Sequence, residues 1–142
     1  MSFLSKLFGN KNTDEPSFDG IDISLLKTDL HSHLIPGIDD GSESMEESIT
    51  MIRYLHELGY TKIITTPHVM NDYYRNTPEI IHAGTTKLIE AVKEAEIPIN
   101  IEVAAEYLID DAFESKIKNN ELLTFGKNHL LIELPFINAP HN

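Results

Sequence analysis

Histidine and acidic residues are concentrated near the start of this chain. Residues 27–33 read Lys-Thr-Asp-Leu-His-Ser-His, and residues 36–41 read Pro-Gly-Ile-Asp-Asp-Gly. In an extended segment, residues i and i+2 point to the same side, so His31 and His33 can bind one metal ion while Ser32 faces away. Asp39 and Asp40 follow in a loop whose glycines allow sharp turns. This spacing predicts a metal site built from imidazole nitrogens and carboxylate oxygens.

Further residues of metal-ligand types follow other predicted strands. Apolar runs that alternate with capped helical patterns predict repeated β/α units. The predicted strands cover residues 25–30, 62–66, 97–103 and 129–134, and the predicted helices cover residues 44–58, 77–95 and 110–117. Because helices connect successive strands, the strands should lie parallel with their C-terminal ends on one rim. That rim would collect His31, His33, His68 and Glu106, with Glu133 as a further candidate.

Each candidate ligand also has a simpler structural explanation. His31 and His33 could be satisfied by ordinary hydrogen bonds, and Asp39 and Asp40 could form an acidic turn. His68 follows Thr-Thr-Pro and could be a loop histidine. Glu106 ends an apolar stretch, where an unpaired charge is costly, so a cation is its natural partner unless the carboxylate is partly exposed.

The remaining histidines and the loop after His68 carry weaker signals. We interpret His56, His82 and His129 as surface or packing residues, because the first two fall inside predicted helices and the third precedes a strand. Tyr74 and Arg75 could bind an aromatic or anionic substrate, since a guanidinium group matches phosphate oxygens. A solvated loop is the alternative for both.

Composition limits the class of protein. The chain has 142 residues, a formal net charge of -12 and no cysteine. The charge disfavours nucleic acid as a partner, and the absence of cysteine excludes thiolate zinc sites. Residues 1–20 are expected to form an amphipathic hook, with Phe3, Leu4, Leu7 and Phe8 at helical spacing, and a polar tether. The hook either frays or docks on its own domain, or it anchors the chain to a membrane surface or a partner.

Several motifs together resemble the polymerase and histidinol phosphatase (PHP) superfamily. They are Asp29-Leu-His-Ser-His33, Pro36-Gly-Ile-Asp-Asp-Gly41, Thr66-Pro-His68, Ala105-Glu-Tyr107 and Leu131-Ile-Glu-Leu-Pro135. The chain is most similar to the manganese-dependent tyrosine-protein phosphatases of capsular and exopolysaccharide loci. The resemblance implies an α/β fold in which residues 21–142 form the first half of a distorted (β/α)7 barrel.

The resemblance also implies a di- or trinuclear metal centre and roles for individual residues. His31 and His33 would hold the first metal, Glu106 would bridge the first and second, and Asp40 and His68 would bind the third, with Asp39 as neighbour or substitute. Glu106 and Asp40 would be the catalytic residues, and Tyr74 and Arg75 would bind substrate. Manganese is the implied metal, although iron and zinc accept the same ligands. The implied substrate is a phosphotyrosine protein, the tyrosine kinase of polysaccharide export. The implied location of this chain is the cytoplasm, either free or peripheral to the membrane.

The sequence departs from the family's pattern after residue 142. A later ligand histidine followed by an arginine and a C-terminal Asp-x-His do not occur in it. We therefore expect a truncated domain whose isolated chain has weak or no phosphatase activity and whose open sheet edge favours self-association or a complementing chain. The alternatives are an inactive metal- or partner-binding module, a histidinol-phosphatase-like enzyme and an amidohydrolase-like enzyme.

Overall fold

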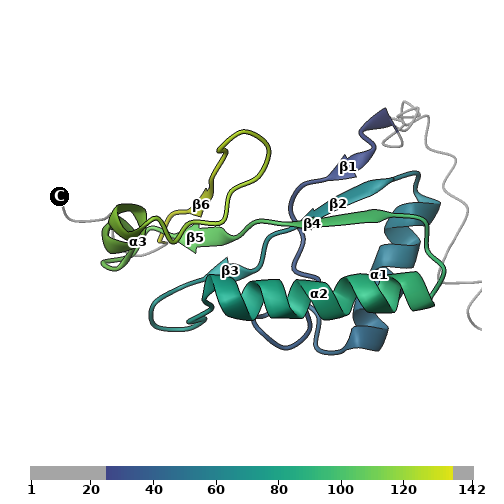
Figure 1. Ribbon diagram of the computed structural model, residues 1–142, viewed down its shortest axis with the longest axis horizontal. Coiled ribbons are helices and arrows are strands. Elements are labelled where there is room, and N and C mark those ends of the chain that lie inside the picture. The colour runs from purple at the N-terminus through teal and green to yellow at the C-terminus, as the bar shows by residue number, and fades with distance from the viewer. Residues whose placement is uncertain (1–24, 136–142) are drawn as a thin grey trace, which may run out of the picture.

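A computed structural model describes residues 25–135 of the chain (Figure 1). The predicted hook of residues 1–20 lies outside this range. The elements, in chain order, are β1 Thr28–Asp29, α1 Met45–Glu57, β2 Lys62–Thr65, β3 His68–Val69, α2 Pro78–Glu94, β4 Asn100–Val103, β5 Glu106–Leu108, α3 Phe113–Asn119 and β6 Leu131–Glu133. Helices α1 and α2 lie beside the β1–β2–β4 sheet, whereas α3 lies at the other end near β5.

All strand pairings in the described residues are parallel, as predicted. One sheet has the order β1-β2-β4 and the other has the order β3-β5-β6. The second and third predicted strands, at residues 62–66 and 97–103, correspond to β2 and β4, but the short strands β3 and β5 that follow them were not predicted. Pro67 separates β2 from β3 and cannot donate to a ladder. Ala104 and Ala105 separate β4 from β5, opposite the break between β2 and β3. The Ala104 amide still donates to the Thr65 carbonyl at 3.0 Å.

The two long helices begin where their capping residues predicted. Ser44 Oγ accepts a hydrogen bond from the Glu47 amide at 3.2 Å, while the Glu47 carboxylate accepts from the Glu43 amide at 2.8 Å, one residue earlier than in the usual reciprocal box. Thr77 caps α2, and Pro78 occupies its first turn. These caps explain why α1 and α2 were predicted closely.

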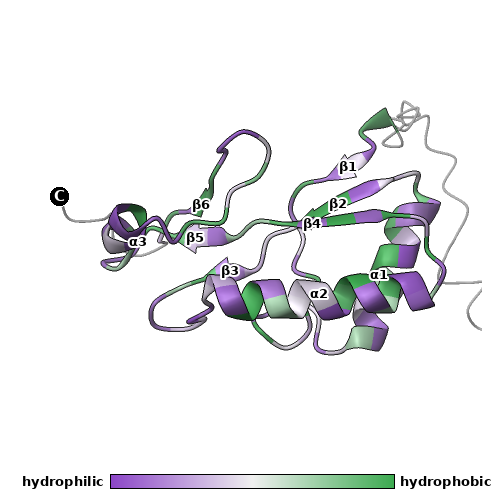
Figure 2. Ribbon diagram, in the orientation of Figure 1, coloured by the Kyte–Doolittle hydropathy of each residue, from purple (hydrophilic) through white to green (hydrophobic). Residues whose placement is uncertain are grey.

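The hydrophobic core lies between the two long helices and the strands. It includes Ile52 of α1, Ile63 of β2, and Ile81 and Leu88 of α2, all of which are fully buried. Hydrophobic and hydrophilic bands alternate along both helices in Figure 2, as expected for helices that bury one face. Burying side chains of this size stabilises a fold by about 1.5–3 kcal/mol each. This packing holds the ends of β1, β2 and β4 in fixed relative positions.

Candidate metal centre

The His-x-His segment is held in place by the two threonines that end the neighbouring strand. Thr65 Oγ1 donates to the Ser32 carbonyl at 2.9 Å and accepts from the Leu34 amide at 3.0 Å. The Thr66 amide also donates to the Ser32 carbonyl, at 2.7 Å. Strand β1 itself ends at Asp29, earlier than predicted, so these bonds take over from the sheet ladder. They fix the backbone that carries His31 and His33.

The acidic loop folds back onto His33. The Ser42 amide donates to the His33 carbonyl at 3.0 Å. A Cβ atom at Gly41 would collide with the carbonyl oxygen and Cβ of His33, so this close approach requires glycine. The loop thereby brings Asp39 within 2.9 Å of His33 Nδ1 and Asp40 within 3.8 Å of the same atom.

His68 and Glu106 meet because their strands are paired in register. They are direct partners in the β3–β5 pairing, and the Glu106 amide donates to the Pro67 carbonyl at 3.0 Å. Both residues are at least nine-tenths buried. Their side chains leave the same face of adjacent parallel strands, so His68 Nδ1 lies 3.3 Å from Glu106 Oε2.

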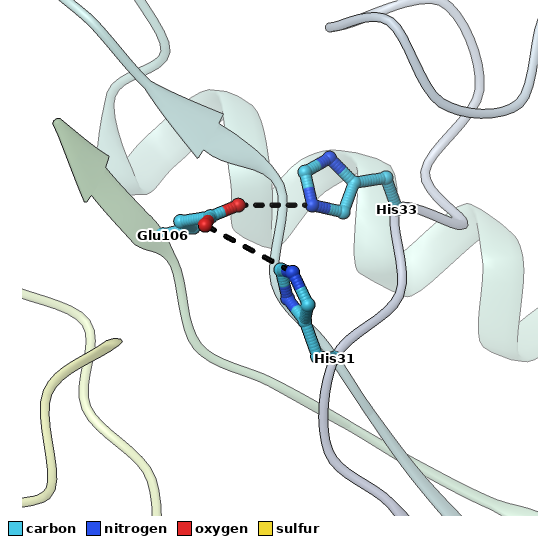
Figure 3. A group of neighbouring side chains, drawn as sticks. All are labelled: His31, His33 and Glu106. Carbon is cyan, nitrogen blue, oxygen red and sulfur yellow. Dashed lines mark ion pairs between the residues drawn. The ribbon is translucent and has the colours of Figure 1, made fainter. Parts of the chain in front are cut away.

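The Glu106 carboxylate is the centre of the cluster. His33 Nε2 lies 3.2 Å from Glu106 Oε2, and His31 Nε2 lies 3.9 Å from Glu106 Oε1. Figure 3 shows both imidazole rings facing this carboxylate from the same side of the chain. His31 is half exposed, whereas His33 and Glu106 are largely buried. The cluster therefore extends from the interior to the surface.

Three overlapping groups of residues present ligand atoms close enough to share an ion. Within each group, the ligand atoms lie within 4.8 Å of one another. The groups are His31–His33–Glu106, His33–Asp40–His68 and His68–Glu106–Glu133. The five predicted metal-ligand residues are thus brought together by the fold. Glu133, which sequence reasoning treated only as a further candidate, joins them because β6 pairs with β5; its place at the end of a predicted strand was the available signal.

The donor set fits a divalent metal. His68 Nδ1 and Glu133 Oε2 are buried and have no hydrogen-bond partner among residues 25–135, although they lie 3.7 Å apart. Two ligands held about 2.1 Å from one ion at about 90–110° lie about 3.0–3.4 Å apart. The distances from Glu106 Oε2 to His33 Nε2 and to His68 Nδ1, 3.2 Å and 3.3 Å, match this range. Buried polar atoms without partners are costly, and a shared cation would satisfy them.

The charges around His33 favour its protonated form when no metal is bound. Burial lowers the pKa of His33, but the hydrogen bond to Asp39 and the charges of Asp39, Glu106 and Asp40 outweigh burial and raise it above its ordinary value. Burial raises the pKa of Asp39, but hydrogen bonds from His33 and from two backbone amides outweigh it and hold that pKa below its ordinary value. Asp39 is therefore an ionised carboxylate.

Tyr74 lies at the cluster, whereas Arg75 is engaged within its own loop. The Tyr74 ring stacks on His68, with centroids 5.6 Å apart and planes 11° apart. The pKa of Tyr74 is raised by desolvation and by the charges of Asp40 and Asp39. Arg75 Nε donates to the Asn71 carbonyl at 2.7 Å, and its side chain is exposed.

The other histidines are used elsewhere in the fold. His56 Nδ1 lies 3.4 Å from the Tyr60 carbonyl at the end of α1, and His129 stacks on Phe125 with centroids 5.4 Å apart. His82 is exposed on α2. None of the three belongs to a ligand group among residues 25–135.

Comparison with known proteins identifies the family. The model of the capsular polysaccharide synthesis family CpsB/CapC matches residues 27–140. The chain belongs to the CpsB/CapC family. It is 31% identical over 113 residues to the tyrosine-protein phosphatase YwqE of Bacillus subtilis, a match that covers 79% of this chain and 44% of YwqE. It is also 31% identical over 107 residues to the tyrosine-protein phosphatase CpsB of Streptococcus pneumoniae, covering 74% of this chain and 44% of CpsB.

A solved structure supports the same assignment. A chain from the crystal structures of YwqE and CpsB, described as unique metal-dependent tyrosine phosphatases, superposes with a TM-score of 0.71 at 31% identity. The superposition covers 80% of this chain and 46% of that chain. This CpsB/CapC chain thus spans less than half the length of the relatives it matches. Helices long and apolar enough to cross a membrane do not occur between residues 25 and 135.

Proposed function

We propose that this chain carries part of a metal-dependent phosphomonoesterase that acts on phosphotyrosine. The observation that carries the proposal is the sharing of His33, His68 and Glu106 among three ligand groups. Shared ligands are typical of sites that bind two or more ions side by side, and such sites hydrolyse phosphate esters. Manganese is the proposed ion because of the family resemblance, since the nitrogen and oxygen donors accept manganese, iron and zinc alike.

The ligand groups give each residue a proposed role. His31, His33 and Glu106 would hold one ion, Asp40 and His68 another, and Glu106 with Glu133 and His68 a third. Bound ions of this kind lower the pKa of water to near neutrality and neutralise charge on phosphoryl oxygens. Because the chain has no cysteine, a cysteinyl phosphate cannot form on it, which favours direct attack by water.

The chain's own side chains would orient the substrate and handle the proton. Asp40 has an exposed carboxylate beside His68 Nε2, at 3.5 Å, so it can accept a hydrogen bond or a proton from a water that approaches from solvent. The Tyr74 ring offers an aromatic surface for a tyrosyl ring, and the remaining N–H groups of Arg75 can donate to phosphate oxygens. We propose both as substrate-binding residues.

The proposed physiological substrate is a phosphotyrosine protein, such as the tyrosine kinase of a polysaccharide export system. YwqE and CpsB are named tyrosine-protein phosphatases, which supports the substrate class. To reach such a kinase, this chain would act in the cytoplasm or at the membrane surface. The parallel strands would form the first half of a distorted barrel. Because the chain spans less than half of its relatives, we propose that it is weakly active by itself.

Phosphate release from a phosphotyrosine peptide tests this proposal. With Mn²⁺ present, we expect slow turnover of the phosphotyrosine peptide, little turnover of a phosphoserine peptide or of histidinol phosphate, and none after chelation. His33→Ala should abolish the activity, and His82→Ala, an exposed histidine outside the cluster, should leave it unchanged. Turnover that persists in a chelator, or a preference for histidinol phosphate, would contradict the proposal.

A second candidate function is a binding module that associates through its open edges. Within residues 25–135, strands β1 and β6 each have one paired neighbour, so their outer edges carry backbone groups that no described strand pairs. Between residues 32–34 and helix α1 lies a groove of about 460 Å³ with an almost wholly apolar lining that includes Leu34, Met51 and Leu55. Sedimentation should detect association that Tyr54→Glu, at the rim of the groove, suppresses and Ile117→Glu, on α3, does not. A monomer at all concentrations would contradict this second candidate.

A further inference from the structure

The Asp39 carboxylate accepts three hydrogen bonds from residues in and around the cluster. Its side chain is completely buried. Its Oδ2 atom accepts hydrogen bonds from His33 Nδ1 at 2.9 Å and from the His68 amide at 2.9 Å, and its Oδ1 atom accepts from the Gly41 amide at 3.0 Å. A carboxylate has about four lone-pair sites, so three of them are already used. Asp39 also belongs to none of the ligand groups among the described residues.

The bond to His33 determines which ring nitrogen faces the cluster. An ionised carboxylate can only accept hydrogen bonds, so His33 Nδ1 must carry the proton. In the neutral ring, Nε2 then has a free lone pair, and this atom lies 3.2 Å from Glu106 Oε2. A metal ligand needs that lone pair. The opposite tautomer would present an N–H group to the cluster and could not bind an ion.

The same carboxylate fixes the acidic loop against β3. The Asp39 side chain receives the amide of His68, while Asn76 Nδ2 donates to the His68 carbonyl at 2.8 Å and to the Ile38 carbonyl at 3.0 Å. Asp39 therefore holds the amide of His68, and Asn76 holds its carbonyl. Asp40, the next residue after Asp39, is thereby kept 3.5 Å from His68 Nε2.

We propose that Asp39 is a positioning residue, which holds His33 in the Nδ1–H tautomer and holds the Asp40 loop against His68. It would act through its neighbours and would not bind the metal itself. The inference deepens the proposed metal-dependent function and rests on it for the effect on metal affinity, but the tautomer of His33 can be measured without any metal. Groups that orient a ligand in this way typically contribute 10–100-fold to metal affinity.

The first measurement is the ¹⁵N spectrum of the histidine rings in the metal-free wild-type chain, recorded while the pH is raised until the ring signals stop changing and the rings are neutral. We expect His33 to be in the Nδ1–H form, with its signals identified by their loss in His33→Ala. A His33 ring that carries its proton on Nε2 would overturn the proposal. This measurement remains decisive even if variants at Asp39 fail to fold.

The second measurement is Mn²⁺ affinity by calorimetry for the wild type, Asp39→Asn and a matched control. Asp110→Asn is the control, because Asp110 also accepts two backbone amides, from Asn71 at 2.7 Å and Ala112 at 2.9 Å, but forms no hydrogen bond or ion pair with a histidine among the described residues. We expect the Kd of Asp39→Asn to rise by about 10–100-fold and that of Asp110→Asn to change by less than about threefold. The asparagine amide cannot accept all three bonds, whichever way it is turned.

The outcomes separate the inference from the proposed function. Equal effects of the two substitutions, or an unchanged Kd in Asp39→Asn, would overturn the positioning role. If the wild-type chain does not bind Mn²⁺, the proposed function fails, and the tautomer of His33 decides the present inference by itself. Unfolding by urea, measured in parallel, should show comparable losses for both variants, because each gives up a backbone hydrogen bond.

Discussion

Replacing Glu106 with glutamine should remove most of the stabilisation that a divalent metal gives to this chain. Glu106 belongs to two of the three ligand groups, and its Oε2 atom lies 3.2 Å from His33 and 3.3 Å from His68. Glutamine keeps the size of the side chain but has no charge and only one acceptor oxygen. Only the His33–Asp40–His68 group would then keep its full set of ligands.

The size of the effect follows from linkage between binding and folding. At a free Mn²⁺ concentration of about 100 times the Kd, one bound ion stabilises a fold by about 2.7 kcal/mol. For a chain of 142 residues, this corresponds to a rise in Tm of about 10 °C. We expect Glu106→Gln to retain less than about half of the rise. Without metal, the free energy of unfolding of the variant should differ from that of the wild type by about 1 kcal/mol or less. The substitution removes a buried charge that is costly when no cation is bound.

Thermal unfolding of the wild type and the variant, with Mn²⁺ and with chelator, measures this directly. Glu102→Gln is the matched control, because Glu102 lies on β4, pairs with Lys62 at 2.7 Å and is outside the ligand groups. The control should show the full metal-induced rise. A Glu106→Gln variant that shows the same rise as the wild type would refute the assignment of Glu106 as a shared ligand.

Three further predictions concern the fold around the cluster. Tyr107→Phe should cost about 1–3 kcal/mol in urea unfolding, because the Tyr107 hydroxyl accepts from the Leu123 amide at 2.7 Å and donates to the Glu121 carbonyl at 3.3 Å. Burial and the charge of Glu121 raise the pKa of Tyr107 against the opposing Leu123 bond, so its stabilising contribution is complete below about pH 10 and is lost as the pH rises through the folded-state pKa. Urea unfolding at about pH 8 and pH 11 should therefore show a larger loss for the wild type than for Tyr107→Phe, and equal losses would contradict the argument. Gly41→Ala should weaken Mn²⁺ binding in calorimetry by forcing His33 to move, whereas Gly37→Ala, where a Cβ meets open space at a φ of 70°, should cost about 1 kcal/mol of stability with little effect on binding.

Much of the fold was predictable because its signals are local. Ser44 and Thr77 mark the starts of the two long helices, and apolar residues at helical spacing mark their buried faces. The parallel arrangement followed from the alternation of strands and helices, and the strand pairings confirm it. The short strands β3 and β5 were not predicted, because two and three residues are too few to show an alternating pattern. Closure into a barrel stays a prediction.

The site was predictable in its members but not in its internal hydrogen bonds. His31, His33, His68 and Glu106 follow the predicted strands, so the predicted parallel topology was enough to group them, although His68 and Glu106 lie within β3 and β5 themselves. The part played by Asp39 depends on contacts with His68, 29 residues away, which no local pattern indicates. The role of Arg75 stays a prediction from its residue type, and the bond from its Nε atom to the Asn71 carbonyl is a further contact that no local pattern indicates.

The metal content of the purified 142-residue chain tests the central claim most directly. The chain would be loaded with Mn²⁺, dialysed against metal-free buffer and analysed by mass spectrometry for metal per chain. We predict retained metal at near-stoichiometric amounts, its loss in the double variant His31→Ala/His33→Ala, and its retention in His82→Ala. Wild-type protein that retains no metal, or a double variant that retains as much as the wild type, would contradict the account.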